Sequence, residues 1–407
     1  ATADNHTARG SSAASISHPE LEPRGVRRGG YVIMPQILYW LRYTDNVFAT
    51  ENNTESSFVS EIIPQVTANS DWNNHALNFK FDAQISRNHE FSSEDYEDWN
   101  LAIDGVVDIS RDTTFASGIG FGREHIERSA PDDANGTEPT AYDQGQLFAR
   151  YTHGANRLVT QINLNLVRKE YDDVDAIRLG VPVRLDNSDQ DRTESSLRWR
   201  GGYRYLENEQ VFISLEAFDR DYDEPRNFSD QDQSSTGFEF LAGASFAYHG
   251  ILLGEIAVGY RSQDYEEPLQ DIETPLVEAT LLWNLTDLTS LDIVVDHQVQ
   301  ESVDQVFSGY TSSSATVRLD HELRRNLLLN LSLRYARDEF VGIDPARRDD
   351  DVYSLAAGAT YRINRNIYLG ARYAYLERKS DTNTTFGDSS RFDFAANLIS
   401  FRLRAQF

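Results

Sequence analysis

Apolar and polar residues alternate along most of this chain, from about residue 31 to its last residue. In the segment 77–86, for example, the odd positions hold Leu, Phe, Phe, Ala and Ile, and the even positions hold Asn, Lys, Asp, Gln and Ser. A two-residue period places one set of side chains on each face of a β-strand. The pattern predicts strands with one apolar and one polar face, and no run approaches the roughly 18 apolar residues of a membrane-spanning helix.

Repeats of this pattern predict about eighteen strands, an even number, as single-chain outer-membrane barrels require. We expect them at residues 31–45, 57–70, 74–87, 96–111, 113–126, 141–154, 157–170, 192–206, 209–221, 234–248, 251–264, 274–286, 289–302, 310–323, 326–340, 351–363, 366–378 and 391–407.

The connections between these strands alternate in length. Short links such as 111–113 and 249–250 alternate with long, polar and acidic links such as 124–142 and 171–192. Short turns at one rim and long loops at the other are typical of an outer-membrane barrel, whereas a soluble β-sandwich or propeller gives no reason for this asymmetry. We therefore predict an all-β fold, in which residues 31–407 form a transmembrane antiparallel up-and-down β-barrel.

Aromatic residues on the apolar faces gather near the ends of the predicted strands, where amphipathic rings suit the two lipid–water interfaces. The preference of aromatic residues for strands would also enrich them there. They are Trp199, Tyr203, Tyr205, Tyr248, Trp283, Tyr335, Tyr361, Tyr373 and Tyr375. The last strand ends on an outward aromatic residue, Phe407, which is similar to the C-terminal signal of outer-membrane barrels. We expect the barrel assembly machinery to recognise it.

Composition removes several kinds of chemistry. Lys and Arg number 38 against 65 Asp and Glu, and the net charge of −27 excludes a simple binder of the nucleic-acid backbone. The absence of cysteine excludes disulfides, thiolate metal sites and cysteine nucleophiles. The nine histidines show no paired ligand spacing, and no G-x-S-x-G motif occurs. We predict no enzymatic activity and no cofactor. The many Asp and Glu residues do supply the residue types that a glycosidase or lyase needs, so residue types alone do not exclude those two activities.

Acidic loops raise the question of calcium. Segments 186–191 and 230–232 supply oxygen ligands but lack the Gly and the terminal Glu of an EF-hand loop. They are expected to form a solvated acidic rim, so no metal site is predicted.

Residues 1–30 are polar and small and show no period. We expect them to form a periplasmic N-terminal extension rather than a domain. Two alternatives are that they plug the lumen or that they contact a periplasmic partner.

Several motifs in the first third of the chain resemble those of a known family. They are G-V-R-R-G-G-Y-V-I-M-P-Q-I from Gly25, Y-T-D-N-V-F ending at Phe48, I-I-P-Q-V around Pro64, A-N-S-D-W-N-N-H-A-L-N-F, and D-G-V-V-D-I-S-R ending at Arg111. The family is that of outer-membrane β-barrel porins associated with exopolysaccharide export loci. The resemblance implies an outer-membrane barrel that moves or anchors extracellular polysaccharide, and it implies no catalytic residues.

The alternation also assigns the polar faces to the interior, which in a barrel of about eighteen strands is wide enough for an aqueous lumen. The expected basic residues of the lumen are Arg42, Arg198, Arg200, Arg204, Arg318, Arg334, Arg362, Arg372, Arg402 and Arg404. The expected acidic ones are Asp82, Asp104, Asp108, Glu239, Glu255, Glu278, Asp292 and Asp296. Facing arcs of opposite charge would create a transverse field across the water. The alternative is that these groups neutralise one another between neighbouring strands.

One long loop contains an apolar stretch, A-I-R-L-G-V-P-V-R-L at 176–185. Apolar residues in a solvent loop fold inward as a constriction, pack as a lid, or meet a partner, while a small hairpin is the simpler alternative. The candidate constriction residues are Arg178, Leu179, Gly180, Val181, Pro182 and Arg184.

Together these features predict a pore in the outer membrane of a Gram-negative bacterium, with both termini in the periplasm. Its expected role is export of a hydrophilic polymer, most simply exopolysaccharide. The alternatives are a diffusion porin for small charged solutes and a non-conducting barrel that anchors surface material. Expected partners are outer-membrane lipid and lipopolysaccharide, the barrel assembly machinery, the polysaccharide and periplasmic export proteins.

Overall fold

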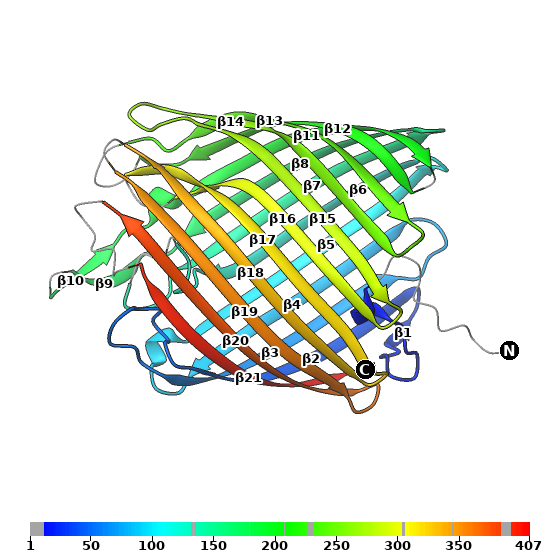
Figure 1. Cartoon of the computed structure of the whole chain (residues 1–407), viewed down its shortest axis with the longest axis horizontal. Helices are drawn as coiled ribbons and strands as arrows, with labels where there is room; N and C mark the ends of the chain where they lie inside the picture. Colours follow the sequence, from blue (N-terminus) through cyan, green and yellow to red (C-terminus); the bar gives the residue numbers. More distant parts are fainter. Residues whose placement is uncertain are drawn as a thin grey trace.

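The computed structural model describes residues 12–131, 133, 136–178, 180–206, 208–225, 231–302, 306–343, 346–383 and 392–407. An antiparallel sheet of 18 strands closes on itself as a barrel (Figure 1). Its strands are β2 (Tyr31–Thr44), β3 (Ser57–Ser70), β4 (Ala76–Asn88), β5 (Tyr96–Ser110), β6 (Thr113–His125), β7 (Ala141–Ala155), β8 (Leu158–Tyr171), β11 (Arg192–Leu206), β12 (Glu209–Tyr222), β13 (Ser235–Tyr248), β14 (Leu252–Tyr265), β15 (Ile272–Thr286), β16 (Thr289–Glu301), β17 (Phe307–Arg324), β18 (Leu327–Gly342), β19 (Arg348–Arg362), β20 (Ile367–Thr382) and β21 (Phe394–Gln406).

The barrel closes between its first and last strands. On β2, Leu41 lies opposite Ser60 of β3 on one side and opposite Phe401 of β21 on the other. Every other barrel strand pairs with the strand before it and the strand after it in the barrel. The closed wall therefore leaves no sheet edge. Lipid could not form hydrogen bonds with the unpaired backbone groups of such an edge. The predicted up-and-down barrel is confirmed.

The two faces of the sheet differ sharply. Trp283 and Leu291 lie opposite each other on β15 and β16, and Trp283 is 43% exposed on the outer face. The alternate positions carry polar groups that meet across several strands: Arg200 of β11 bonds Glu255 of β14. Only the concave face can bring such distant strands together. The interior is therefore polar and the exterior apolar, as in barrels that face lipid.

Turn chemistry explains the compact end of the barrel. The β13–β14 turn contains only His249 and Gly250 between strand-flanking residues, with φ of 50° and 71°. Two positive φ values define a type I′ turn, whose twist matches that of the strands it joins. The remaining short connections lie at the same end, and the long ones lie at the other (Figure 1). We call these the short-turn end and the long-loop end.

The N-terminal segment enters the barrel at the short-turn end. It comprises the 3-10 turn η1 (Ala13–Ser15), an irregular stretch, and β1 (Val26–Arg28), which pairs with β2. Three contacts fix residues 12–24 to the inner wall: the Ala13 N–H donates to Ser290 Oγ (2.9 Å), His18 Nε2 lies 2.8 Å from Glu322 Oε2, and the Tyr368 hydroxyl donates to the Leu21 carbonyl.

The described residues 12–24 contact the inner wall, the position that the plug alternative gives them, and the assignment of residues 1–30 to a periplasmic extension stays a prediction. Ala13, Ile16 and His18 are each no more than 9% exposed. The segment lies across the short-turn mouth of the lumen.

Two further features lie outside the barrel wall. The strands β9 (Val174–Arg178) and β10 (Val181–Leu185) form a separate hairpin at the long-loop end. Within the described residues the helices are three single turns, η1, η2 (Ser92–Glu94) and η3 (Ser188–Gln190), and none is long and apolar enough to cross a membrane.

Candidate functional site

The structure places each charged residue predicted for the lumen on the inner face of its strand. Their positions are Arg42 on β2, Asp82 on β4, Asp104 and Asp108 on β5, Arg198, Arg200 and Arg204 on β11, Glu239 on β13, Glu255 on β14, Glu278 on β15, Asp292 and Asp296 on β16, Arg318 on β17, Arg334 on β18, Arg362 on β19, Arg372 on β20, and Arg402 and Arg404 on β21. The part that these side chains play in permeation stays a prediction.

Part of this charge is neutralised within the wall. Arg198 bonds Glu216 and lies 3.3 Å from Glu239, and Arg200 makes a bidentate pair with Glu255 at 2.9 and 2.7 Å. Along β11 to β14, the charged side chains therefore neutralise one another across the strands, which was the alternative to a transverse field.

A second group of arginines lacks such partners. We call Arg362, Arg372, Arg402 and Arg404, on β19 to β21, the arginine wall. No carboxylate oxygen of a described residue lies within 4.0 Å of their side-chain nitrogens, and the charges of Arg404 and Arg372 repel that of Arg402. This stretch of the interior carries net positive charge.

The middle of the barrel is hollow. Glu278, Arg318, Arg334 and Arg372 all lie on the inner face, yet all four are exposed. The inner-face Val294 is 39% exposed. Because these side chains face the interior, the space that exposes them is inside the barrel. Water therefore has room at this depth, in agreement with an aqueous lumen.

At the long-loop end, the described residues of the connection 126–140 between β6 and β7 fold into the mouth. Arg378 of β20 donates from Nη1 to the Ser129 carbonyl (3.1 Å), and Arg348 of β19 donates to the Pro131 carbonyl (3.5 Å). Both arginines stand on a part of the wall away from β6 and β7, so the loop reaches across the mouth. No local sequence pattern marks this acidic connection as inward.

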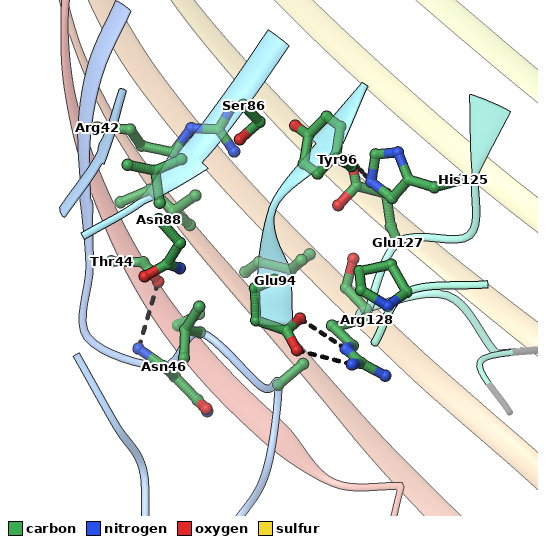
Figure 2. Close-up of a pocket in the computed structure, with 18 of the residues that line it drawn as sticks. Arg42, Thr44, Asn46, Ser86, Asn88, Glu94, Tyr96, His125, Glu127 and Arg128 are labelled. Carbon is green, nitrogen blue, oxygen red and sulfur yellow. Dashed lines mark hydrogen bonds and ion pairs between the residues drawn. The ribbon is translucent and has the colours of Figure 1, made fainter. Parts of the chain in front are cut away.

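A buried ion pair anchors the same loop (Figure 2). Arg128 donates from Nε and Nη2 to both carboxylate oxygens of Glu94, each at 2.8 Å, and lies 3.4 Å from Asp133. The side chains of Arg128 and Glu94 are 10% and 5% exposed. Burial alone would lower the pKa of Arg128, but the hydrogen bonds to Glu94 and the charges of Asp133 and Glu94 outweigh it and raise the pKa.

Cavities border the described residues of this loop on two sides. One, of about 140 Å³, lies between the loop and the ends of β2 to β5, where Arg42, Asn88 and Tyr96 line it (Figure 2). The other, of about 310 Å³, lies on the far side and is lined by Tyr222 and Tyr310 among others.

The apolar stretch 176–185 does not form this constriction. The hairpin alternative describes it: β9 and β10 project beyond the long-loop end (Figure 1), and Ile177 and Val181 are 63% and 58% exposed. Arg184 lies 3.3 Å from Asp173, within the same projection, and Gly180, Val181 and Pro182 form its exposed tip. Leu179 and the side chain of Arg178 lie outside the described residues. Strand pairing within the hairpin satisfies the backbone of this segment, and its part in permeation stays a prediction.

Replacing Glu94 with Ala should loosen the connection 126–140. Arg128 would keep only Asp133, and breaking a buried ion pair costs about 3–5 kcal/mol because a charge is left uncompensated. We expect faster proteolytic cleavage within 126–140 and noisier single-channel currents, with an intact barrel. The control is Glu97→Ala, whose carboxylate is 65% exposed and pairs with Arg87. Equal cleavage rates in the two variants would show that the Arg128–Glu94 pair does not hold the loop.

Comparison with known proteins agrees with this architecture. The family model described as "Putative beta-barrel porin 2" matches residues 18–407. The chain belongs to this family. Membership confirms the resemblance to an outer-membrane porin family, while the match carries no link to exopolysaccharide. Porins are channels, in agreement with the prediction that the chain is not an enzyme, and they reside in the outer membrane of Gram-negative bacteria.

Solved structures resemble this porin-family barrel in fold alone. The copper transporter OprC is 10% identical with a TM-score of 0.50, over 95% of this chain and 81% of that one. OccK2 (OpdF) of Pseudomonas aeruginosa is 11% identical with a TM-score of 0.49, over 92% and 98% of the two chains. OccAB3 of Acinetobacter baumannii is 12% identical with a TM-score of 0.48, over 93% and 99%. No curated protein matches the sequence.

Proposed function

We propose that this protein is a substrate-selective diffusion pore for small, charged, hydrophilic solutes. The observation that carries the proposal is a hollow, polar middle section between two mouths that the chain itself narrows. Residues 12–24 occupy one mouth and the connection 126–140 crosses the other. Narrow openings select by size, and charged side chains that line a pore select by charge.

Export of a hydrophilic polymer such as exopolysaccharide is the second candidate, and the resemblance of residues 25–111 favours it. A polymer has to pass both mouths at once, so both inward segments would have to move aside. A small solute needs only the openings beside them. For this reason we place the diffusion pore first.

The test is solute flux through the purified protein in planar bilayers and liposomes, with saccharides of graded length. The proposal expects stable channels, entry of mono- and disaccharides, and exclusion of longer oligosaccharides. Transient block of the current by long oligosaccharides, which shows that they enter the lumen, would favour the polymer conduit instead. Absence of both flux and conductance would overturn the pore and favour an anchoring role.

We further propose that the short-turn end and both termini face the periplasm, since outer-membrane barrels keep their short turns on that side. The long acidic loops would then meet lipopolysaccharide. Phe407 would stand at the periplasmic end of β21, where its side chain is 64% exposed. The barrel assembly machinery could reach it there.

Replacing Phe407 with Ala should slow barrel assembly in cells severalfold, because it removes the proposed recognition residue. The measurement is the fraction of protein that migrates as a compact barrel in unheated gel samples after a pulse of synthesis. Phe401→Ala is the matched control, since Phe401 lies on the outer face of the same strand and is 60% exposed. If both variants assemble equally slowly, loss of apolar outer surface explains the effect and Phe407 is not a signal.

A further inference from the structure

The arginine wall combines several positive charges with a lack of neutralising groups. Arg372 lies opposite Gly358 and Ser400, and Arg402 lies opposite Gly370 and Trp40, so the two arginines occupy successive inner-face positions on neighbouring strands. Along β11 to β14, by contrast, Arg198 and Arg200 are held by carboxylates. Here aromatic rings and a hydroxyl take their place.

These non-acidic contacts hold the guanidinium groups in fixed positions. Arg402 stacks over the Trp40 ring at 5.3 Å from its centroid and donates from Nη2 to Thr360 Oγ1 at 3.0 Å. Arg404 lies over the Tyr368 ring at 5.7 Å. A Cβ at Gly370 would come within 3.1 Å of Arg402 Nε, so glycine there lets the side chain lie flat along the wall. The cations are therefore positioned before any solute arrives.

Three donors at this place have no acceptor among the described residues. They are Nε of Arg402, Nε of Arg404 and the indole Nε1 of Trp40, all buried from the surface. Clustered cations that are partly removed from water and unpaired raise the free energy of the site. An anion placed between the guanidinium groups would lower it again.

We propose that the arginine wall binds the carboxylate of a small organic acid, such as a uronic acid, while that solute passes through the lumen. A guanidinium presents paired N–H groups that match the two oxygens of a carboxylate. Trp40 stands beside Arg402 and offers an apolar ring to the body of the solute, which an inorganic anion lacks. The inference rests on the proposed function, because the solute reaches the site through the pore.

Calorimetric titration of the detergent-solubilised protein tests the site without requiring conduction. Glucuronate and glucose are the probes, because they differ only in the carboxylate. We expect saturable binding of glucuronate and none of glucose. Arg402→Gln combined with Arg404→Gln should weaken glucuronate binding about tenfold or more, equal to about 1.4 kcal/mol. Trp40→Phe, which keeps a ring and removes the indole donor, should weaken it severalfold.

The matched control is Arg200→Gln with Glu255→Gln, which alters an inner-face arginine together with its carboxylate partner. It should bind glucuronate as the unmodified protein does. Equal binding of glucose and glucuronate, equal loss in the control, or displacement of glucuronate by a lower concentration of inorganic phosphate would each overturn the assignment. Because binding is measured in solution, a pore that fails to conduct yet binds glucuronate would refute the proposed function alone.

Discussion

Removal of residues 1–24 should raise the single-channel conductance severalfold. The described part of this segment is fixed to three strands of the inner wall, through Ser290, Glu322 and Tyr368, and so lies across the short-turn mouth. A barrel of 16–18 strands has an aqueous channel when nothing fills it. Conductance of the deletion variant in planar bilayers at high salt measures the effect, since high salt suppresses changes in surface charge.

Two outcomes separate obstruction from other causes. Ser17→Ala with Glu20→Gln changes two exposed side chains of the same segment and should leave the conductance as it is in the full chain. An unchanged conductance in the deletion variant would mean that ions already bypass the segment. Both variants have to migrate as compact barrels in unheated gel samples, because only a folded barrel makes the conductance interpretable.

Replacing Arg372 and Arg402 with Glu should shift ion selectivity strongly toward cations. The two changes alter the charge of the inner wall by four units. In water a unit charge about 10 Å from a permeating ion contributes about 0.4 kcal/mol, so four units contribute roughly 1.6 kcal/mol before screening. Because this energy favours the cation and disfavours the anion, we expect the cation-to-anion permeability ratio to rise by more than about tenfold at low salt and by less at high salt, where the Debye length falls below about 10 Å. Reversal potentials across a salt gradient measure it.

The control carries the same change of charge outside the lumen. Arg337 lies on the outer face of β18, and Arg347 precedes β19 with a side chain that is 65% exposed. Their joint replacement by Glu should move the reversal potential little. If the Arg372 and Arg402 variant behaves like this control, the arginine wall does not face the path of the ions.

Local alternation was sufficient to predict the barrel wall. The strand expected at 57–70 is β3 as observed, and the one expected at 192–206 is β11. The two-residue period of a strand can be read from the residues of that strand alone. A register shift of one residue would turn its polar side chains toward the lipid. The inner-face positions of Arg372 and Arg402 follow from the same rule.

The segments that enter the lumen could not be found in this way. The Ala13–Ser290 and Arg378–Ser129 hydrogen bonds join residues 277 and 249 positions apart, and three-dimensional closure decides such contacts. Pairing with Glu255 could not be foreseen for Arg200 either, because it depends on which strands the curvature brings face to face. For residues 176–185 the sequence leaves a hairpin and a constriction both open, and only the position of the neighbouring segments separates the two.

The seam between β2 and β21 has a consequence for the order in which the molecule is made. Asp45 accepts hydrogen bonds from Asn397, 352 positions further along the chain, so this pairing is the most distant that the wall contains among its adjacent strands. Contacts of such sequence separation carry a high loop-closure cost and form late. The residues before β2 are joined directly to that seam through the Gly25–Phe407 bond. These residues can therefore enter the interior while the barrel closes, and they need not pass through a barrel that has already closed.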